Sequence, residues 1–434
     1  GCLLVCLLEN TKIGNTSAIE VYKKLKAPFD LLVGRSEDIT VETLSKEIRG
    51  TFGKDWKPDA LAKDIQKLHN MAKKLADANV TEIDSTGLGR KGLTLFGQRF
   101  ILDAAFFQKL VHDKDNNPLP YTKTGSKEKP FTWVTDQVSG EVRGFPRGLD
   151  IMAILGSETA YAVLKNGGDT DYKNYDKNLE HLKKVLKGKN LKHSKNTYEK
   201  MLYSFMPLFQ SDKQADKKTP GFMRSDMWKK KCLNTALGAW TELRHDTILY
   251  GKQSYTPVLR GMPPQVKRAY LEPNPRVYER LRSVVYDLYT FIDSREPLLN
   301  KYKSLAKILD RLTDISEKEL KGAMPDGEDA AFLGDISSRL QSITEVHEEG
   351  ITGEADSLMP LAADVHTRMP EALTEAVGFP AKIIVVIPVK NKPMLFFGGV
   401  YSYYEFKVPY EKRLTDEKWM EELKTGKHKP FLLR

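Results

Sequence analysis

The sequence predicts a mostly α-helical protein of the α+β class, with a large helical body, a long buried central helix and a C-terminal β-hairpin. Two observations predict this class. Apolar residues recur at three- and four-residue spacing over most of the chain, and β-branched and aromatic residues gather near its end, at 382–388 and 394–405. We expect residues 1–375 to form the helical body. Residues 376–434 then add the β-hairpin and a terminal helix, packed on the same body.

The composition is that of a soluble globular protein. The chain has 434 residues, of which 40% are hydrophobic and 29% charged, enough for two or three domains or one large helical body. Three cysteines without a CxxC pair exclude a disulfide framework and offer no zinc-ligand spacing. The apolar opening is too short to span a bilayer, and the sequence predicts no transmembrane segment. Its abrupt apolar start suggests that the chain is part of a longer product.

The net charge of +10 favours contact with polyanions, acidic surfaces or anionic lipid head groups. The basic residues are scattered, apart from clusters at 183–195 and 229–231, and neither cluster interleaves aromatic residues as a single-strand platform would. We therefore interpret them as a solvated lysine-rich face and expect no specific nucleic-acid partner.

The elements follow in chain order as helices joined by short connections. The small hairpins are expected near 80–98 and 131–144, the second because of a Ser-Gly turn pair. The sequence GLGRKG at 87–92 fits a dinucleotide-binding pattern, but no helix opens after it, so we interpret it as a turn between strands. Helices are expected at 57–78, 99–112, 174–187, 196–210, 226–256, 275–291, 297–313, 316–322, 328–345 and 416–424.

The helix expected at 226–256 is apolar around most of its circumference, which is typical of a buried helix. The ionisable residues Glu242, His245 and Asp246 occupy the remaining sector, and Lys252 and Gln253 extend it. Burying such groups is costly unless they satisfy one another or face a cleft.

Three interpretations of this polar strip stay open. It could be a buried polar network that fixes helix packing. It could bind a divalent metal ion through His245 and Asp246, joined by Asp364 and His366, since residues two apart on an extended chain point the same way. It could instead bind an organic or peptide ligand, with Glu242 or His245 as the candidate for proton transfer.

Two arginines outside the strip are further candidates for ligand binding. The guanidinium groups of Arg99 and Arg147 each offer a planar fork of donors that suits a carboxylate or a phosphate. Structural salt bridges use the same geometry, so both interpretations remain.

The stretch LNTALGAWTELRHDTILYGKQSYT at 233–256 resembles the central signature of the domain-of-unknown-function family 3160. Further stretches resemble that family in the same order, so the resemblance covers nearly the whole chain. Among the residues in these characteristic stretches are Glu242, Arg244, His245, Asp246, Lys252, Gln253, Asp364 and His366. The stretches lie at 29–40, 96–110, 145–161, 361–367, 375–389 and 397–406.

The resemblance implies a location and a partner but no activity. Family members are generally longer, with an additional N-terminal helical half, often behind a secretion or lipoprotein signal, and this chain resembles their C-terminal portion. We therefore expect an extracellular or cell-surface protein that contacts the N-terminal half of the same product or forms a homo-oligomer. The expected function is that of a structural or ligand-binding protein, with Arg244 among the binding residues. The alternative is a metal-dependent, hydrolase-like enzyme with its site between 226–256 and 361–367.

Overall fold

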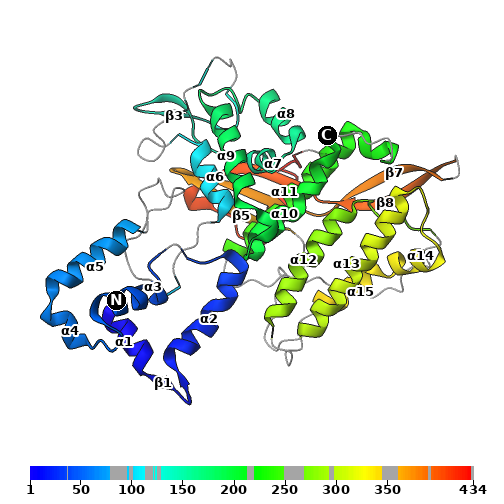
Figure 1. The fold of residues 1–434 in the computed structure, drawn as a ribbon. Coiled ribbons are helices and arrows are strands. Elements are labelled where there is room, and N and C mark those ends of the chain that lie inside the picture. Colours follow the sequence, from blue (N-terminus) through cyan, green and yellow to red (C-terminus); the bar gives the residue numbers. More distant parts are fainter. Residues whose placement is uncertain are drawn as a thin grey trace. The chain divides into compact units, whose positions relative to one another are not determined.

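The computed structural model (Figure 1) confirms a mostly helical protein with small antiparallel sheets. Contacts divide the chain into two compact units. Unit 1 comprises Gly1–Tyr121 with Lys195–Glu199, and unit 2 comprises Thr122–Ser194 with Lys200–Arg434. The structure describes residues 1–36, 38–78, 95–96, 101–112, 121, 123–124, 129–212, 219–248, 268–292, 298–344, 360–389 and 392–431.

Unit 1 is built from short amphipathic helices. Buried residues that include Val5, Val41 and Ile48 form its core. Thr40 caps the third helix by accepting a hydrogen bond from the Thr43 backbone N–H. The elements are α1 (Cys2–Asn10), β1 (Lys12–Ile13), β2 (Thr16–Ser17), α2 (Ala18–Val33), α3 (Val41–Phe52), α4 (Pro58–Lys63), α5 (Ile65–Ala78) and α6 (Leu102–Leu110). The predicted hairpin at 80–98 lies outside the described residues, apart from 95–96.

Unit 2 begins with the predicted hairpin at 131–144, in which β3 (Trp133–Asp136) pairs antiparallel with β4 (Gly140–Arg143). Asp136 accepts hydrogen bonds from two backbone N–H groups of the turn, and Gly140 has a positive φ of 75°. The helices that follow are α7 (Gly148–Ile154), α8 (Glu158–Asn166), α9 (Tyr175–Lys189), α10 (Thr197–Phe205) and α11 (Asp226–Ile248), with 3-10 segments η1 (Leu191–His193), η2 (Met206–Asp212) and η3 (Gly221–Arg224). The first turn of α10, up to Glu199, is assigned to unit 1.

A second group of helices packs around its own apolar cluster, with Val285, Ile308 and Leu312 buried at the contact. Two of the predicted helices, 297–313 and 316–322, form one continuous helix instead, because no breaker separates them and apolar residues keep the helical period. The group consists of α12 (Pro275–Phe291), α13 (Leu298–Leu320), α14 (Gly327–Gly334) and α15 (Ile336–Thr344).

The C-terminal part holds two separate sheets. The predicted hairpin is confirmed as β7 (Ala381–Val389) paired with β8 (Lys392–Val400). The sequence did not indicate the second sheet, in which β5 (Leu361–Arg368), β6 (Glu371–Val377) and β9 (Tyr403–Pro409) lie in that order. The predicted boundary after residue 375 therefore falls inside β6. Helix α16 (Asp416–Lys424) begins where predicted, with Thr415 as its N-cap.

Helix α11 is the buried axis of unit 2, as predicted. Leu233, Leu237 and Trp240 are fully buried, and the helix contacts α7, α8, β5, β6, β8 and β9. Figure 1 shows α11 in green alongside the orange strands. A single long element of this kind lets segments that are distant in sequence meet on its different faces.

A glycine on α11 makes room for the link between the two sheets. Tyr401 and Ser402 carry the chain from β8 to β9, and Asn234 Nδ2 donates to the Tyr401 carbonyl. A Cβ atom at Gly238 would lie 2.6 Å from Tyr401 Cγ, so no larger residue fits without a shift. Two turns beyond Asn234, Glu242 Oε2 accepts a hydrogen bond of 2.9 Å from the Tyr401 hydroxyl.

We predict that Gly238→Ala destabilises the protein by about 1–3 kcal/mol, because the added methyl group overpacks the contact with Tyr401. Urea denaturation measures the change. The matched control is Gly188→Ala, another helical glycine with nothing within 4 Å of the added Cβ. It should stabilise by roughly 0.5–1 kcal/mol through helix propensity. Equal effects of the two substitutions would contradict the steric account.

Candidate functional site

Within the predicted polar strip of α11, Glu242 and Asp246 line the same cavity, and His245 lies next to them with partners of its own. Glu242 meets Tyr401, whereas His245 lies between two carboxylates. His245 Nδ1 is 3.1 Å from Asp246 Oδ1, and its Nε2 is 3.1 Å from Asp416 Oδ2. The three residues predicted as one strip therefore make contacts with different parts of unit 2.

His245 forms an ionic bridge from α11 to the start of α16. Burial lowers the pKa of His245, but the hydrogen bonds and charges of Asp246 and Asp416 outweigh it and raise the pKa to about 9. The imidazole is therefore protonated at neutral pH and donates from both nitrogens. Asp416 Oδ1 also accepts from the Ala362 backbone N–H at 3.1 Å, which extends the bridge to β5.

A β-bulge separates the other two predicted metal ligands. Asp364 pairs with Thr374 and His366 with Leu373, so one extra residue lies between the two pairs. Thr374 and Leu373 point to opposite faces of β6, and paired residues share a face. Asp364 and His366 thus lie on opposite faces. The rule that residues two apart point the same way fails at the bulge.

The side-chain contacts agree with that register. Thr374 Oγ1 donates to Asp364 Oδ1 at 2.7 Å, and Arg413 Nε lies 3.7 Å from Asp364 Oδ2. The ring of His366 packs edge-on against Phe145 with centroids 5.9 Å apart. Burial and nearby arginines lower the pKa of His366 to about 4.

No metal-binding cluster is formed by the side chains that the structure describes: it contains no group of three or more His, Cys, Asp or Glu placed to hold an ion. Helix α11 nevertheless contacts the segment 361–367: Arg244 Nη2 donates a hydrogen bond to the Val365 carbonyl at 3.2 Å. Arg244 is buried at this contact. The remaining predicted binding residues Arg99, Lys252 and Gln253 lie outside the described residues.

Arg147, predicted as a ligand-binding residue, is held in a buried ionic network. Its Nη1 is 2.6 Å from Asp169 Oδ2, and its Nε donates to Glu405 Oε2 at 2.6 Å. The guanidinium also lies over the rings of Phe131 and Phe431, 4.8 Å from each centroid. Burial lowers the pKa of Arg147, but the two carboxylates outweigh it and raise the pKa. The structural interpretation of this arginine therefore fits better than the binding one.

The same network continues through Arg143. Its guanidinium is fully buried and donates to both oxygens of Asp150, at 3.0 and 2.7 Å, and to the Asp169 carbonyl at 3.1 Å. Tyr175 donates to Asp150 at 2.6 Å, and Thr132 Oγ1 donates to Asp169 at 2.9 Å. Every one of these groups has at least one partner, as buried charges require.

A cavity of about 440 Å³ lies beside Glu242, on the side of α11 that faces α10 and α12. Its walls are largely apolar, and its carboxylates are Glu242, Asp246 and Glu272. This volume and mixture are typical of small-molecule sites. The other lining residues are Met201, Ser204, Phe205, Leu208, Thr235, Ala239, Leu243, Asn274, Val277, Tyr278, Leu281 and Tyr401.

The three carboxyl groups of the cavity differ in whether a cation pairs with them. Lys231 pairs with Glu272, and His245 pairs with Asp246, whose side chain is half exposed. Glu242 forms no ion pair with any cation in the described part of the chain. Burial raises the pKa of Glu242 to about 7, and the hydrogen bond from Tyr401 opposes that rise. Glu242 therefore changes its charge near neutral pH.

Sequence reasoning found Glu242 but missed its environment. Tyr401 and Asp416 complete the contacts of the strip, yet Tyr401 lies in a stretch predicted as one strand and Asp416 was assigned to a helix start. Both lie more than 150 residues away in sequence, at separations of 159 and 171. No local pattern marks a contact at that range.

The fold and the site define an α+β protein in which a buried helix carries a titratable carboxyl to an apolar-walled cavity. The family described as "Protein of unknown function (DUF3160)" matches residues 3–431, and the chain belongs to this family. No curated protein and no solved structure matches the chain. None of the helices that the structure describes is long and apolar enough to cross a membrane.

We predict that Glu242→Gln makes stability less dependent on pH. The carboxyl binds its proton more tightly in the folded protein, with a pKa of about 7 against 4.5 for the unfolded chain. The contribution of Glu242 to wild-type stability should therefore fall by about 3 kcal/mol in total as pH rises from 4.5 through about 7. The glutamine has no charge to bury. The free energy of unfolding of Glu242→Gln, relative to wild type, should therefore increase over the same pH interval.

Urea unfolding at about pH 5 and about pH 8 measures that difference. The control Glu421→Gln alters an exposed carboxyl of α16 and should leave the pH dependence unchanged. A wild-type stability that does not fall over this interval, relative to Glu242→Gln, would show that Glu242 is ionised without cost.

We also predict that Arg147→Met destabilises by about 3–5 kcal/mol, because it leaves Asp169 and Glu405 as buried charges without their cation. Thermal or chemical unfolding monitors the loss. Arg282→Met is the control, since Arg282 and Asp310 form an exposed pair whose removal costs about 1 kcal/mol or less. A small effect at Arg147 would mean that the network is open to water.

Proposed function

We propose that this protein is a secreted or surface-associated ligand-binding protein, and that the cavity between α10, α11 and α12 is its binding site. One observation carries the proposal: Glu242, a carboxyl without a cationic partner among the described residues, borders an apolar-walled cavity of about 440 Å³. The location outside the cell is supported by the family resemblance alone.

The cavity favours an apolar ligand that carries a protonated amine. Its apolar walls, which include Leu208 and Leu281, suit a hydrocarbon or aromatic body. Glu242 supplies the counter-charge in the interior, and Asp246, with its half-exposed side chain, adds negative charge. A cation next to Glu242 lowers its pKa, so ligand binding at neutral pH releases a proton from the carboxyl.

The structure favours binding over the hydrolase alternative. Direct contacts of Arg244 with β5, and of His245 with Asp416, occupy the region between α11 and 361–367. The cavity lies on the other side of α11, because Glu242 is about 200° from Arg244 around the helix. Proton transfer by Glu242 remains the second candidate function, favoured by a pKa of about 7.

Isothermal titration calorimetry with tryptamine tests the proposal. Tryptamine joins an aromatic body to a protonated amine, and indole-3-acetate is its anionic counterpart. We expect tryptamine to bind, indole-3-acetate to bind at least about tenfold more weakly, and Glu242→Gln to weaken tryptamine about tenfold or more. The observed enthalpy for wild type should vary with the ionisation enthalpy of the buffer, because a proton leaves Glu242.

The control variant Glu421→Gln changes net charge equally, far from the cavity lining, and should bind tryptamine as wild type does. Equal binding of the amine and the acid, or binding that Glu242→Gln leaves unchanged, contradicts the assignment of this cavity.

A further inference from the structure

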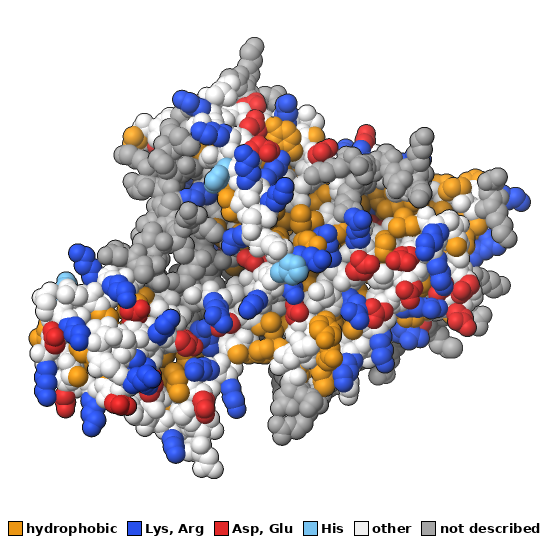
Figure 2. All heavy atoms as spheres, viewed as in Figure 1, with side chains coloured by type: hydrophobic (Ala, Val, Ile, Leu, Met, Phe, Trp, Pro, Cys, Tyr) orange, Lys and Arg blue, Asp and Glu red, His pale blue; other side chains and the backbone are white. Residues whose placement is uncertain are grey.

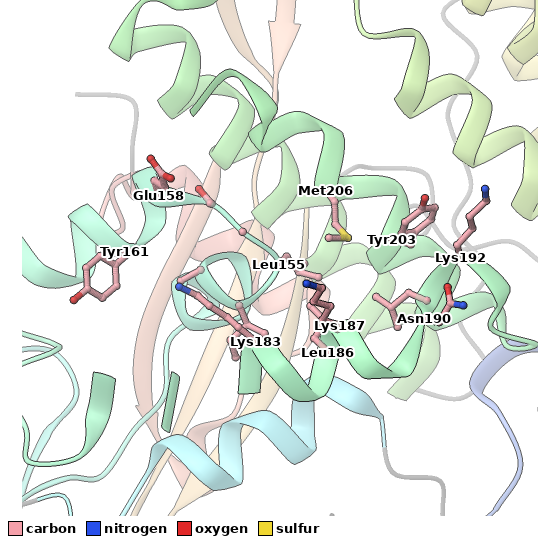
Figure 3. Close-up of a pocket in the computed structure, with 15 residues that line it drawn as sticks. Leu155, Glu158, Tyr161, Lys183, Leu186, Lys187, Asn190, Lys192, Tyr203 and Met206 are labelled. Atoms are coloured by element: carbon pink, nitrogen blue, oxygen red, sulfur yellow. The ribbon is translucent and has the colours of Figure 1, made fainter. Parts of the chain in front are cut away.

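A second cavity in unit 2, of about 530 Å³, has a different chemical character. Figure 3 shows that it lies between α9 and the segment that follows α10, with Glu158 and Tyr161 at one end and Lys192 and Tyr203 at the other. Its floor consists of buried apolar residues of α7, α9 and the adjoining turns. They are Ala153, Ile154, Leu155, Leu186 and Leu191.

Three lysines form the rim of this floor. Lys183 and Lys187 lie one turn apart on the same face of α9, and Figure 3 shows both side chains reaching toward the cavity. Figure 2 shows basic side chains gathered over α9. Against Lys183, Lys187 and Lys192, the described lining residues offer one carboxylate, that of Glu158.

Lys183 is paired with a carboxylate of its own helix, whereas the other two lysines of the rim are not paired with any described carboxylate. Lys183 Nζ is 2.7 Å from Glu180 and 6.0 Å from the ring centroid of Tyr161. Within the described residues, Lys187 and Lys192 form no ion pair, and both side chains are exposed at the rim. An anion placed between them gains attraction without displacing a protein carboxylate.

The basic rim continues into an adjoining hollow of about 340 Å³, which shares Lys192 and Tyr203 with the first cavity. This hollow adds Arg276 and Arg280, together with Lys200, which pairs with Asp287, and one carboxylate, Glu279. Arg280 stacks on the Tyr203 ring at 3.6 Å and donates to its carbonyl at 2.6 Å, so its guanidinium is held in place. Burial lowers the pKa of Arg280, and the neighbouring Arg276 lowers it further while Glu279 opposes this.

We infer that the cavity of about 530 Å³ with its lysine rim, called the basic groove below, binds an amphipathic anion, a molecule with a hydrocarbon body and a carboxylate or phosphate head. The body lies over Leu155, Leu186 and Leu191, and the head lies between Lys187 and Lys192. A polyanionic chain such as nucleic acid fits less well. Its charges repeat along its whole length, whereas the floor of the cavity is apolar and its cations stand only at the rim.

Calorimetric titration of the whole chain with dodecanoate and with dodecyl phosphate, below their micellar concentrations, tests the inference. We expect one molecule to bind per chain, and the stronger of the two identifies the head group. Dodecanol and dodecyltrimethylammonium keep the same body without the negative charge. Each should bind at least about tenfold more weakly. Added salt should weaken the anions more than dodecanol.

The decisive variant is the pair Lys187→Gln and Lys192→Gln, which should reduce anion affinity about tenfold or more. The matched control, Lys177→Gln with Lys184→Gln, removes the same charge from exposed positions of α9 outside the lining. It should bind as wild type does, and both double variants should melt like wild type, because exposed lysines without partners add little stability.

Three results would overturn the inference. These are equal binding of dodecanol and the anions, equal weakening by both double variants, and tighter binding of a single-stranded oligonucleotide than of either dodecyl anion. Glu421→Gln, at an exposed position outside both linings, serves as an internal reference and should leave anion binding unchanged, whereas Glu242 lines only the other cavity. Failure of the tryptamine experiment and failure of this one are therefore separable.

Discussion

The ion pairs of Arg147 with Asp169 and Glu405 are the interaction on which the rest of unit 2 depends. They join the start of α7 to the loop before α9 and to strand β9, which is 258 residues away in sequence. A buried cation with two partners specifies one arrangement of these segments, because any slippage leaves a charge unpaired in the interior. The strand that Arg147 fixes continues directly from Tyr401, so the same pairing positions the wall of the cavity beside Glu242.

The network also explains how so many acids are tolerated in one core. Burial and the neighbouring Glu405 raise the pKa of Glu375 well above its usual range, which favours its neutral form, and Glu375 accepts a hydrogen bond from the Tyr403 hydroxyl. Two arginines then face the three carboxylates of Asp150, Asp169 and Glu405. The interior can hold these charges because each is paired at short range. Outside this network, burial raises the pKa of Glu242 to about 7 and that of Glu319 to about 8, so the charge of these two carboxyls depends on pH near neutrality.

The sequence predicted the fold class, the buried helix α11 and the C-terminal hairpin, because each depends on local periodicity. It predicted Glu242 as a candidate for the same reason, since a charge stands out on an apolar helix. It could not predict that Asp364 and His366 face apart, because a bulge has no mark in the sequence pattern. Nor could it pair Arg147 with Glu405, because contacts over 258 residues depend on how whole elements pack.

Helix α10 and the segment that follows it separate two cavities of opposite charge. Met201 and Phe205 line the cavity of Glu242, whereas Tyr203 and Met206 line the basic groove. Successive residues of a helix point in different directions, so one short element forms a wall of both cavities. A ligand that shifts α10 in one cavity must change the shape of the other. Two sites that share a wall are thermodynamically coupled whenever that wall has two arrangements, and each ligand then changes the affinity for the other by the same factor.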